Sequence, residues 1–191
     1  MSELNDYTII KKLGSGAFGT VYKAKVKNNN SIVAIKVEDR SKSSRLDYES
    51  KILTDLDNII GFPRLYKLIK TKKQNIAIMD YLGPSLEDLF EFCDHKFSVK
   101  TVLMLGIQIL NRIEQLHKNN YIHRDIKPDN FLIGTAKQKC RIFLIDFGLS
   151  KKYILNNEHV SYNTNKSFNS YYFPKIKISH NRKSYHRSSK G

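Results

Sequence analysis

The chain has 191 residues but no tryptophan, only two cysteines and only four prolines. Cys93 and Cys140 are too few to build a disulfide framework, and no metal-ligand spacing links them. We therefore expect two reduced thiols, which fits a cytoplasmic or nuclear compartment. No apolar run reaches the roughly 18 residues that a membrane span needs. The best apolar run, residues 101–110, predicts a buried helix instead, so no membrane association is expected.

Acidic residues are scarce, since 18 Asp and Glu stand against 33 Lys and Arg and leave a net charge of +15. The imbalance is steepest in residues 151–191, which hold nine basic residues and one acidic residue. Such an excess favours acidic partners, among them phosphate groups and acidic protein segments. A basic run is also typical of a solvated, disordered end, and we favour that interpretation for the tail. The hydrophobic content of 40% is that of a globular domain.

Local patterns in the first 80 residues predict a small antiparallel sheet with one helix, which is an α+β lobe. β-branched and aromatic residues predict strands at residues 7–12, 20–26, 31–37, 65–69 and 76–80. The helix is expected between the third and fourth strands, with Ser43 or Ser44 as its cap. Its apolar stripe consists of Leu46, Ile52, Leu53 and Leu56.

A mainly helical part follows a linker at residues 82–84. Ser85 and Asp88 form a capping-box pattern that opens a helix to about residue 92. Ser98 caps a longer helix, whose expected buried face consists of Val102, Leu105, Ile109, Ile113 and Leu116. After a loop at residues 121–130, two short strands are expected at residues 131–133 and 141–145. From residue 151 onward the periodicity fades, which predicts loop or disorder.

The first segment with chemical meaning is GSGAFG at residues 14–19. Glycines let the backbone approach a polyphosphate closely and direct amide groups at its oxygens. A dinucleotide-binding turn would need a helix after the glycines. Here a β-branched strand follows, which indicates a flap that covers nucleotide phosphates. Taken alone, the same glycines also fit an ordinary hairpin.

The second is VAIK, residues 33–36, which places Lys36 inside an apolar strand. A buried lysine is costly unless its charge is paired, and phosphate oxygens together with a carboxylate would pair it. Glu49 on the predicted helix is the partner that we favour. Glu38 and Asp39 are rival carboxylates, but on the same strand they lie too near in sequence to reach back easily. A lysine at a strand end can also extend its ammonium into solvent.

The most specific segment is HRDIKPDN at residues 123–130. Asp125 is suited to accept the proton of an attacking hydroxyl, and Lys127 to stabilise a transferred phosphate. Asn130, five residues after Asp125, is suited to hold a magnesium ion. A fourth segment, DFG at residues 146–148, directly follows an apolar strand. Its carboxylate, Asp146, can therefore face a magnesium ion that bridges phosphates.

These four segments occur in the order typical of eukaryotic protein kinases, and within them the chain resembles the casein kinase I family. The resemblance covers roughly residues 5–165 and rests on KVE at 36–38, LGPSLEDLF at 82–90, HRDIKPDNFLIG at 123–134 and DFGLSKKY at 146–153. It implies a bilobal α+β fold that binds ATP and Mg²⁺ between the lobes. It also implies transfer of the γ-phosphate to Ser or Thr hydroxyls of proteins.

The resemblance further implies which residues form the site. Met79 matches the gatekeeper position, and Leu82 would offer backbone hydrogen bonds to adenine. The implied catalytic residues are Asp125, Lys127, Lys36 and Glu49, and the implied metal ligands are Asn130 and Asp146. The implied nucleotide-binding residues are Leu13, Gly14, Ser15, Gly16, Ala17, Phe18, Gly19, Val21, Ala34, Lys36, Met79, Leu82, Leu132 and Ile145.

The expected organisation is an N-lobe at residues 1–82, a partial C-lobe at 83–168 and a basic, disordered tail at 169–191. Because the resemblance fades before the family's later helices, we expect an incomplete C-lobe and marginal stability of the isolated chain. The expected partners are protein substrates, acidic or phosphorylated ones among them, and the expected state is a monomer. The arginine of the family's acidic-substrate site has no match here, so substrate preference is the least specified property.

Two other functions compete with phosphoryl transfer. A regulatory module that binds Mg-ATP without turnover is favoured by the incomplete C-lobe. A nucleic-acid binder is suggested by the aromatic residues among basic ones in residues 151–191. No nucleic-acid-binding module is recognisable, so a nucleic-acid partner is not expected. The complete set of predicted catalytic and metal-binding residues favours the kinase over both.

Overall fold

The computed structural model describes residues 4–16, 19–40, 45–156 and 158–160. The described residues all belong to one compact unit. The predictions for Ala17, Phe18, the cap at Ser43 or Ser44, and the tail at 169–191 lie outside the described residues.

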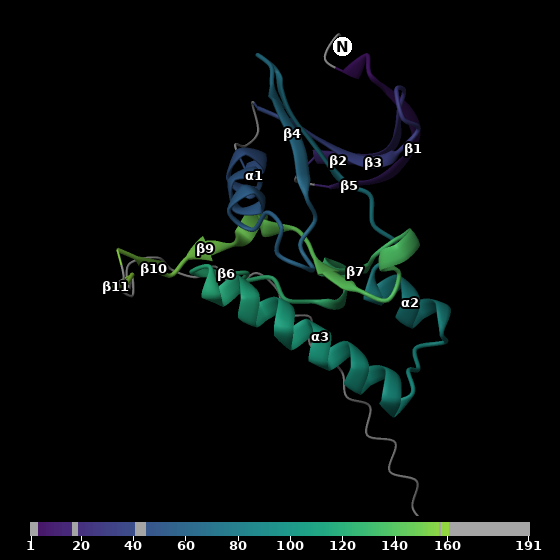
Figure 1. Ribbon diagram of the computed structural model, residues 1–191, viewed down its shortest axis with the longest axis vertical. Coiled ribbons are helices and arrows are strands. Elements are labelled where there is room, and N and C mark those ends of the chain that lie inside the picture. The colour runs from purple at the N-terminus through teal and green to yellow at the C-terminus, as the bar shows by residue number, and fades with distance from the viewer. Residues whose placement is uncertain (1–3, 17–18, 41–44, 157, 161–191) are drawn as a thin grey trace, which may run out of the picture. The chain divides into compact units, whose positions relative to one another are not determined.

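A five-stranded antiparallel sheet forms the N-lobe, in the order β1-β2-β3-β5-β4 (Figure 1). Its strands are β1 (Tyr7–Gly16), β2 (Gly19–Val26), β3 (Ile32–Asp39), β4 (Leu65–Lys70) and β5 (Gln74–Asp80). The five predicted strands are confirmed. β1 runs further than predicted because its glycine-rich end continues to pair with β2, as far as Gly16 opposite Gly19.

The single helix of the N-lobe, α1 (Arg45–Asp55), packs against β4 and β5 (Figure 1). Its predicted apolar stripe is confirmed, because four side chains are buried in the core: Leu46, Ile52, Leu53 and Leu56. The start of the helix is tied to the sheet, since the Leu46 amide donates to Glu38 Oε2 over 3.0 Å. Such a side-chain acceptor satisfies one of the amides that a helix leaves unpaired in its first turn.

The C-lobe begins with α2 (Leu86–Phe92) and continues with α3 (Val99–Lys118). The predicted capping box is confirmed, because the Asp88 amide donates to Ser85 Oγ over 3.0 Å and the Ser85 amide donates to Asp88 Oδ2 over 2.8 Å. Ser98 caps α3 by accepting from the Thr101 amide over 3.1 Å. Both helices therefore begin where the local sequence predicts.

Three short antiparallel strand pairs and three turns of 3₁₀ helix complete the described C-lobe. The pairs are β6 (Tyr121–Ile122) with β9 (Lys151–Lys152), β7 (Phe131–Ile133) with β8 (Ile142–Leu144), and β10 (Ile154–Leu155) with β11 (Glu158–His159). The 3₁₀ turns are Pro128–Asn130, Ala136–Gln138 and Phe147–Leu149. The prediction of loop or disorder from residue 151 onward is therefore wrong for β9, β10 and β11. β9 is formed by pairing with a distant strand, which local periodicity cannot show.

The prediction that residues 101–110 form a buried helix is wrong in its burial. α3 is a helix, but Val102 is 53% exposed, Leu103 62% and Ile107 71%. Of the predicted buried face, only Leu116 is fully buried, while Leu105, Ile109 and Ile113 are half-buried. The reason is that, in the described part of the chain, the main partners of α3 are β6 and β8. Among the described helices, none is long and apolar enough to cross a bilayer.

One hydrophobic cluster joins α1 to the C-lobe. Ile52 and Leu53 of α1 belong to the same buried cluster as Leu116, Leu144 and Phe147. A second cluster fills the sheet itself, between β2, β3 and β5. The first cluster holds the inner side of α1 near the 3₁₀ turn that contains Phe147.

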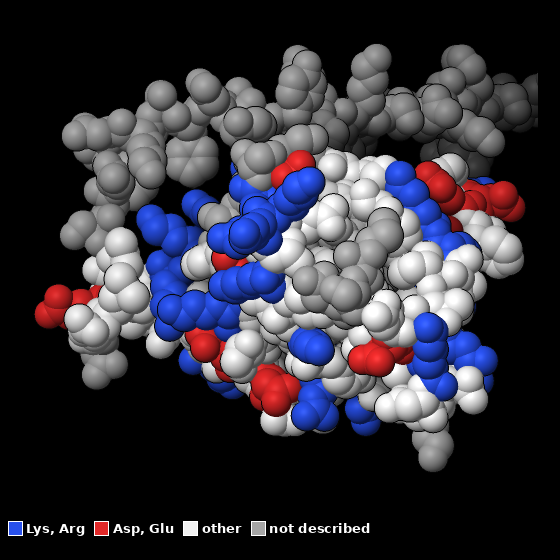
Figure 2. All heavy atoms as spheres, turned by 90° about the horizontal axis from the view of Figure 1, so that it is seen from above, with Lys and Arg blue, Asp and Glu red and all other residues white. Residues whose placement is uncertain are grey.

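Basic side chains are numerous on the N-lobe side of the molecule. Figure 2 shows Lys and Arg gathered over this face, with fewer Asp and Glu among them. Lys11 and Lys23 lie directly opposite each other on β1 and β2, a pairing that like charges make unfavourable. The Lys23 ammonium lies 4.5 Å from the ring centroid of Tyr81, so the ring partly compensates this charge.

Candidate active site

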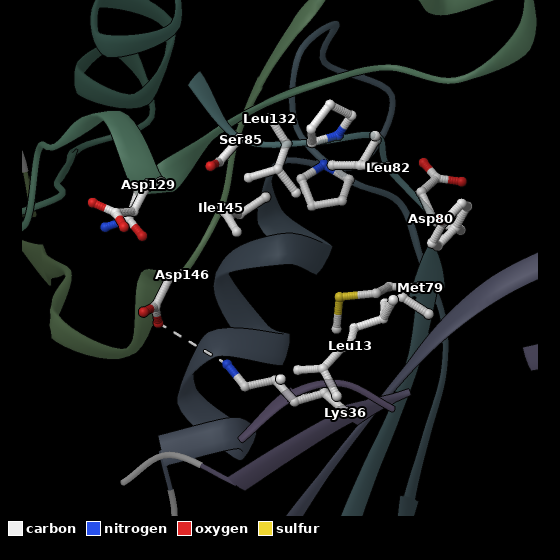
Figure 3. Close-up of a pocket in the computed structure, with 18 of the residues that line it drawn as sticks. Leu13, Lys36, Met79, Asp80, Leu82, Ser85, Asp129, Leu132, Ile145 and Asp146 are labelled. Carbon is white, nitrogen blue, oxygen red and sulfur yellow. Dashed lines mark ion pairs between the residues drawn. The ribbon is translucent and has the colours of Figure 1, made fainter. Parts of the chain in front are cut away.

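A cavity of about 830 Å³ lies between the N-lobe sheet and the start of the C-lobe (Figure 3). The strands β1, β2, β3 and β5 contribute to its lining, together with the linker before α2, strand β7 and residues 145–146. Its volume is within the range of sites for small molecules of nucleotide size. The linker is fixed to β7 by two backbone hydrogen bonds. The Gly83 amide donates to the Ile133 carbonyl over 2.7 Å, and the Ile133 amide donates to the Pro84 carbonyl over 3.0 Å.

The cavity brings together every predicted nucleotide-binding residue that the structure describes. These are Leu13, Gly14, Ser15, Gly16, Gly19, Val21, Ala34, Lys36, Met79, Leu82, Leu132 and Ile145. Glu49, Asn130 and Asp146 also line it. Asp125 and Lys127 do not line it, but Asn130 connects Asp125 to the cavity wall.

Several lining residues were not among the predicted ones: Lys11, Pro63, Asp80, Tyr81, Gly83, Pro84, Ser85, Asp88 and Asp129. Strand alternation alone could not have found Lys11, because a register shift between Lys12 and Gly14 interrupts the alternation between Lys11 and Leu13. Ser85 and Asp88 were recognised only as a helix cap. The cap also lines the cavity because the linker folds back on β7. No local sequence pattern predicts this contact.

Lys36 is paired inside the cavity (Figure 3). Its ammonium lies 2.5 Å from Glu49 Oε2 and 4.0 Å from Asp146 Oδ1. The rival carboxylate Glu38 instead accepts from the amide at the start of α1. Burial by itself lowers the pKa of Lys36, but the carboxylates of Glu49 and Asp146 outweigh it and the pKa lies above its ordinary value. Lys36 therefore stays charged at neutral pH and can meet phosphate oxygens.

The loop at residues 123–130 is held from inside by a buried histidine, His123. His123 Nε2 lies 2.9 Å from the Ile145 carbonyl, and the Asp125 amide donates to His123 Nδ1 over 3.3 Å. Because Nδ1 accepts, Nε2 is the protonated nitrogen and the imidazole is neutral. Burial lowers the pKa of His123 below its ordinary value, which agrees with this assignment. The ring thus fixes the backbone on both sides of the site.

Asp125 lies at the centre of a small polar group. Its Oδ2 accepts from Asn130 Nδ2 over 3.0 Å and lies 3.0 Å from the Lys127 ammonium. Its carbonyl accepts from the same Asn130 nitrogen over 2.7 Å. The hydrogen bond to Asp125 raises the pKa of Lys127 above its ordinary value. A carboxylate held in this way has a fixed orientation and is suited to accept a proton from a bound hydroxyl.

Asn130 and Asp146 offer the oxygen atoms that a magnesium ion prefers. The Asn130 nitrogen is used by Asp125, so its amide oxygen is the atom that can meet a cation. Asp146 contributes a carboxylate that is partly exposed to the cavity. No group of three or more His, Cys, Asp or Glu that could hold a metal occurs among the described residues. The carboxylate of Asp146 and the amide oxygen of Asn130 fit Mg²⁺, which commonly takes one or two protein carboxylates together with substrate phosphates.

Gly19 is the one glycine of the glycine-rich segment whose backbone requires that residue type. Its φ is +109°, and a β-carbon there would collide with the Val37 carbonyl on β3. At Gly14 and Gly16 an added β-carbon would meet nothing within 4 Å. The first two glycines therefore leave open space over the cavity, while Gly19 allows β2 to start close to β3.

The chain matches a protein-family model. The family model described as "Protein kinase domain" matches residues 7–189. The match includes the described sheet, the helices and every residue that lines the cavity.

Proposed function

The chain belongs to the protein kinase family, since residues 7–189 match the model of that family, and we propose that it is a serine/threonine kinase of the casein kinase I type. In this proposal it transfers the γ-phosphate of Mg-ATP to Ser or Thr hydroxyls of protein substrates. The substrates include acidic or phosphorylated proteins, which the net charge of +15 favours. The proposed compartment is the cytoplasm or the nucleus.

One observation carries the proposal: the groups that phosphoryl transfer requires form two clusters, one inside the cavity and one beside it that reaches the cavity wall through Asn130. Lys36 contacts both Glu49 and Asp146, and Asp125 contacts both Lys127 and Asn130. Phosphoryl transfer needs little covalent participation from the protein, so positioning and charge neutralisation account for most of the rate. This arrangement is suited to both.

Each group has a separate task in the proposed reaction. Lys36 binds phosphate oxygens of the nucleotide, and Glu49 holds the ammonium in place. Asp125 orients the acceptor hydroxyl and takes its proton, while Lys127 stabilises the charge on the transferred phosphate. Asn130 and Asp146 would hold Mg²⁺, which supplies neutralisation of the phosphate charge.

The finer assignment to the casein kinase I type rests on the sequence resemblance. In the structure, the segment LGPSLEDLF at residues 82–90 forms the linker and the capped start of α2. Leu82, Ser85 and Asp88 from this segment line the cavity. The characteristic string is thus located where it can influence which nucleotide analogues bind.

The test is transfer of labelled γ-phosphate from Mg-ATP to casein and to the chain itself. We expect phosphoserine and phosphothreonine as products, and a loss of roughly 10²–10⁴-fold in rate for Asp125→Asn. Asp94→Asn is the matched control, because Asp94 is exposed and lies outside the cavity. Its positive φ of 53° also suits asparagine.

Three results would contradict parts of the proposal. Phosphotyrosine as the sole product would overturn the acceptor assignment. Transfer that survives Asp125→Asn would overturn the role of Asp125. A folded chain that binds Mg-ATP without transfer would favour the second candidate, a regulatory nucleotide-binding module. The exposed apolar face of α3 supports that candidate, because the described C-lobe lacks a partner for it.

A further inference from the structure

A polar cluster outside the cavity links three segments of the chain. The Tyr121 hydroxyl donates to Asp55 Oδ2 over 2.5 Å, and the Lys152 ammonium lies 3.7 Å from the same oxygen. The Lys152 ammonium also lies 5.0 Å from the ring centroid of Tyr121. None of the three residues lines the cavity, so nucleotide binding does not explain their contact.

Each of the three segments leads to a functional group of the site. Asp55 is the last residue of α1, the helix that carries Glu49. Tyr121 starts β6, which runs directly into the catalytic loop with Asp125. Lys152 ends β9, which follows the DFG segment, and it pairs with Tyr121 across the two strands. Figure 1 shows the end of α1 above β6 and β9.

The position of Asp55 is unfavourable for the helix considered alone. A carboxylate at a helix C-terminus faces the negative end of the helix dipole, and the last turn of α1 contains no basic residue. The Tyr121 side chain is 1% exposed, so its hydroxyl needs a partner inside the protein. Burial, together with the Asp55 carboxylate, raises the pKa of Tyr121 above its ordinary value and keeps the hydroxyl a donor. The hydrogen bond between the two residues thus offsets the unfavourable charge of Asp55 at the helix end and satisfies the buried hydroxyl of Tyr121.

We propose that Asp55 and Tyr121 are positioning residues, whose hydrogen bond holds the end of α1 against β6 so that Glu49 reaches Lys36. The inference rests on the proposed function, because the importance of the Lys36–Glu49 pair comes from phosphoryl transfer. Lys152 supports the contact by neutralising Asp55. Without the hydrogen bond, the end of α1 separates from the C-lobe more often and Glu49 leaves Lys36 for part of the time.

The test compares hydrogen exchange of the full chain with that of Tyr121→Phe, by mass spectrometry of its fragments. Loss of a hydrogen bond to a charged acceptor predicts roughly tenfold faster exchange in α1. Amides of β2 and β3 keep their exchange rates. Tyr153→Phe is the matched control, because the Tyr153 hydroxyl donates to the His117 carbonyl of α3 and not to α1. Unchanged exchange in α1, or equal acceleration in all segments, would overturn the proposal.

A second variant excludes an explanation by helix stability alone. Asp55→Ala removes the unfavourable charge and introduces the best helix former, so it strengthens α1 as an isolated helix. The proposal nevertheless predicts faster exchange in α1, and slower exchange would contradict it. Asp55 is 37% exposed, so this variant keeps the test available if Tyr121→Phe does not fold. The double variant should exchange no faster than the more affected single variant.

The exchange readout needs no phosphoryl transfer, so it separates this inference from the proposed function. If the chain transfers phosphate, both variants should lower kcat by twofold or more while the KM for ATP stays within twofold. This split is expected because neither Asp55 nor Tyr121 lines the cavity, so no residue that contacts the nucleotide is replaced. A rise in KM with unchanged kcat would contradict a positioning role.

Discussion

At the scale of single residues, two residues near the site have left-handed backbone conformations, which residues other than glycine rarely adopt. Arg124 has a φ of 68°, and Asp146 has a φ of 64° with a ψ of 72°. Such conformations cost free energy and persist only where surrounding contacts fix them. One such contact is visible, because Arg124 Nε donates to the Leu149 carbonyl over 2.6 Å. The backbone strain is therefore located where the loop at residues 123–130 meets the DFG segment.

The lowered pKa of the buried His123 should make the stability of the fold sensitive to acid. Its pKa in the folded chain lies below the ordinary value of 6.5, so the unfolded chain binds more protons once the pH falls below about 6.5. The free energy of unfolding should then decrease as the pH falls, by at most about 1.4 kcal/mol per pH unit from this residue. Urea unfolding between pH 7.5 and 5 measures this slope.

The contribution of His123 is isolated by comparison with His123→Gln, which does not titrate in this range. The difference in unfolding free energy between the two proteins should narrow as the pH falls. Parallel pH profiles would show that another group controls the acid sensitivity.

At the scale of elements, the loop between α1 and β4 is fixed by a contact with α3 and β8. The side chain of Arg112 on α3 donates to the Ile60 carbonyl, and the Leu144 amide of β8 donates to the Gly61 carbonyl over 2.9 Å. Gly61 has a φ of +95°, and a β-carbon there would collide with the Arg112 side chain. The junction of these elements therefore requires glycine at this position.

Gly61→Ala should lower the free energy of unfolding by about 1–3 kcal/mol, because it adds both backbone strain and a collision with Arg112. Equilibrium urea unfolding measures the change. Gly106→Ala is the matched control, since Gly106 is inside α3 and an added β-carbon meets nothing within 4 Å. It should raise stability by up to about 1 kcal/mol through helix propensity. Equal effects of the two substitutions would refute the account of the junction.

At the scale of the whole molecule, the described structure combines a filled core with an exposed apolar face on α3. This face consists of Val99, Val102, Leu103, Met104, Ile107 and Leu110. Contiguous apolar surface of this kind favours binding of partners or self-association. The net charge of +15 acts against self-association through repulsion.

The full chain should bind an apolar fluorescent dye under native conditions, and the double variant Leu103→Gln, Ile107→Gln should bind less of it. Its unfolding free energy should change by no more than about 0.5 kcal/mol, because both side chains are already exposed. Dye fluorescence and equilibrium urea unfolding measure the two effects. Absence of dye binding by the unchanged chain would contradict an apolar face of α3 that is open to solvent.

Features that depend on near neighbours in the chain could be predicted from the sequence alone. The caps at Ser85 and Ser98, the buried stripe of α1 and the five strands were predicted because capping and periodicity act within one or two turns. The residues expected to line a nucleotide site came from the motifs and from the family resemblance that the motifs carry, and the described ones meet in one cavity. Their chemical roles stay predictions.

Which faces are covered and which distant groups meet could be seen only in the folded chain. The exposure of Ile107 depends on which elements pack against α3, and the pairing of β9 with β6 joins segments that no local pattern connects. The hydrogen bond from Tyr121 to Asp55 spans 66 residues of sequence. Periodicity shows which face of a helix is apolar, but burial depends on the partner that the rest of the fold provides.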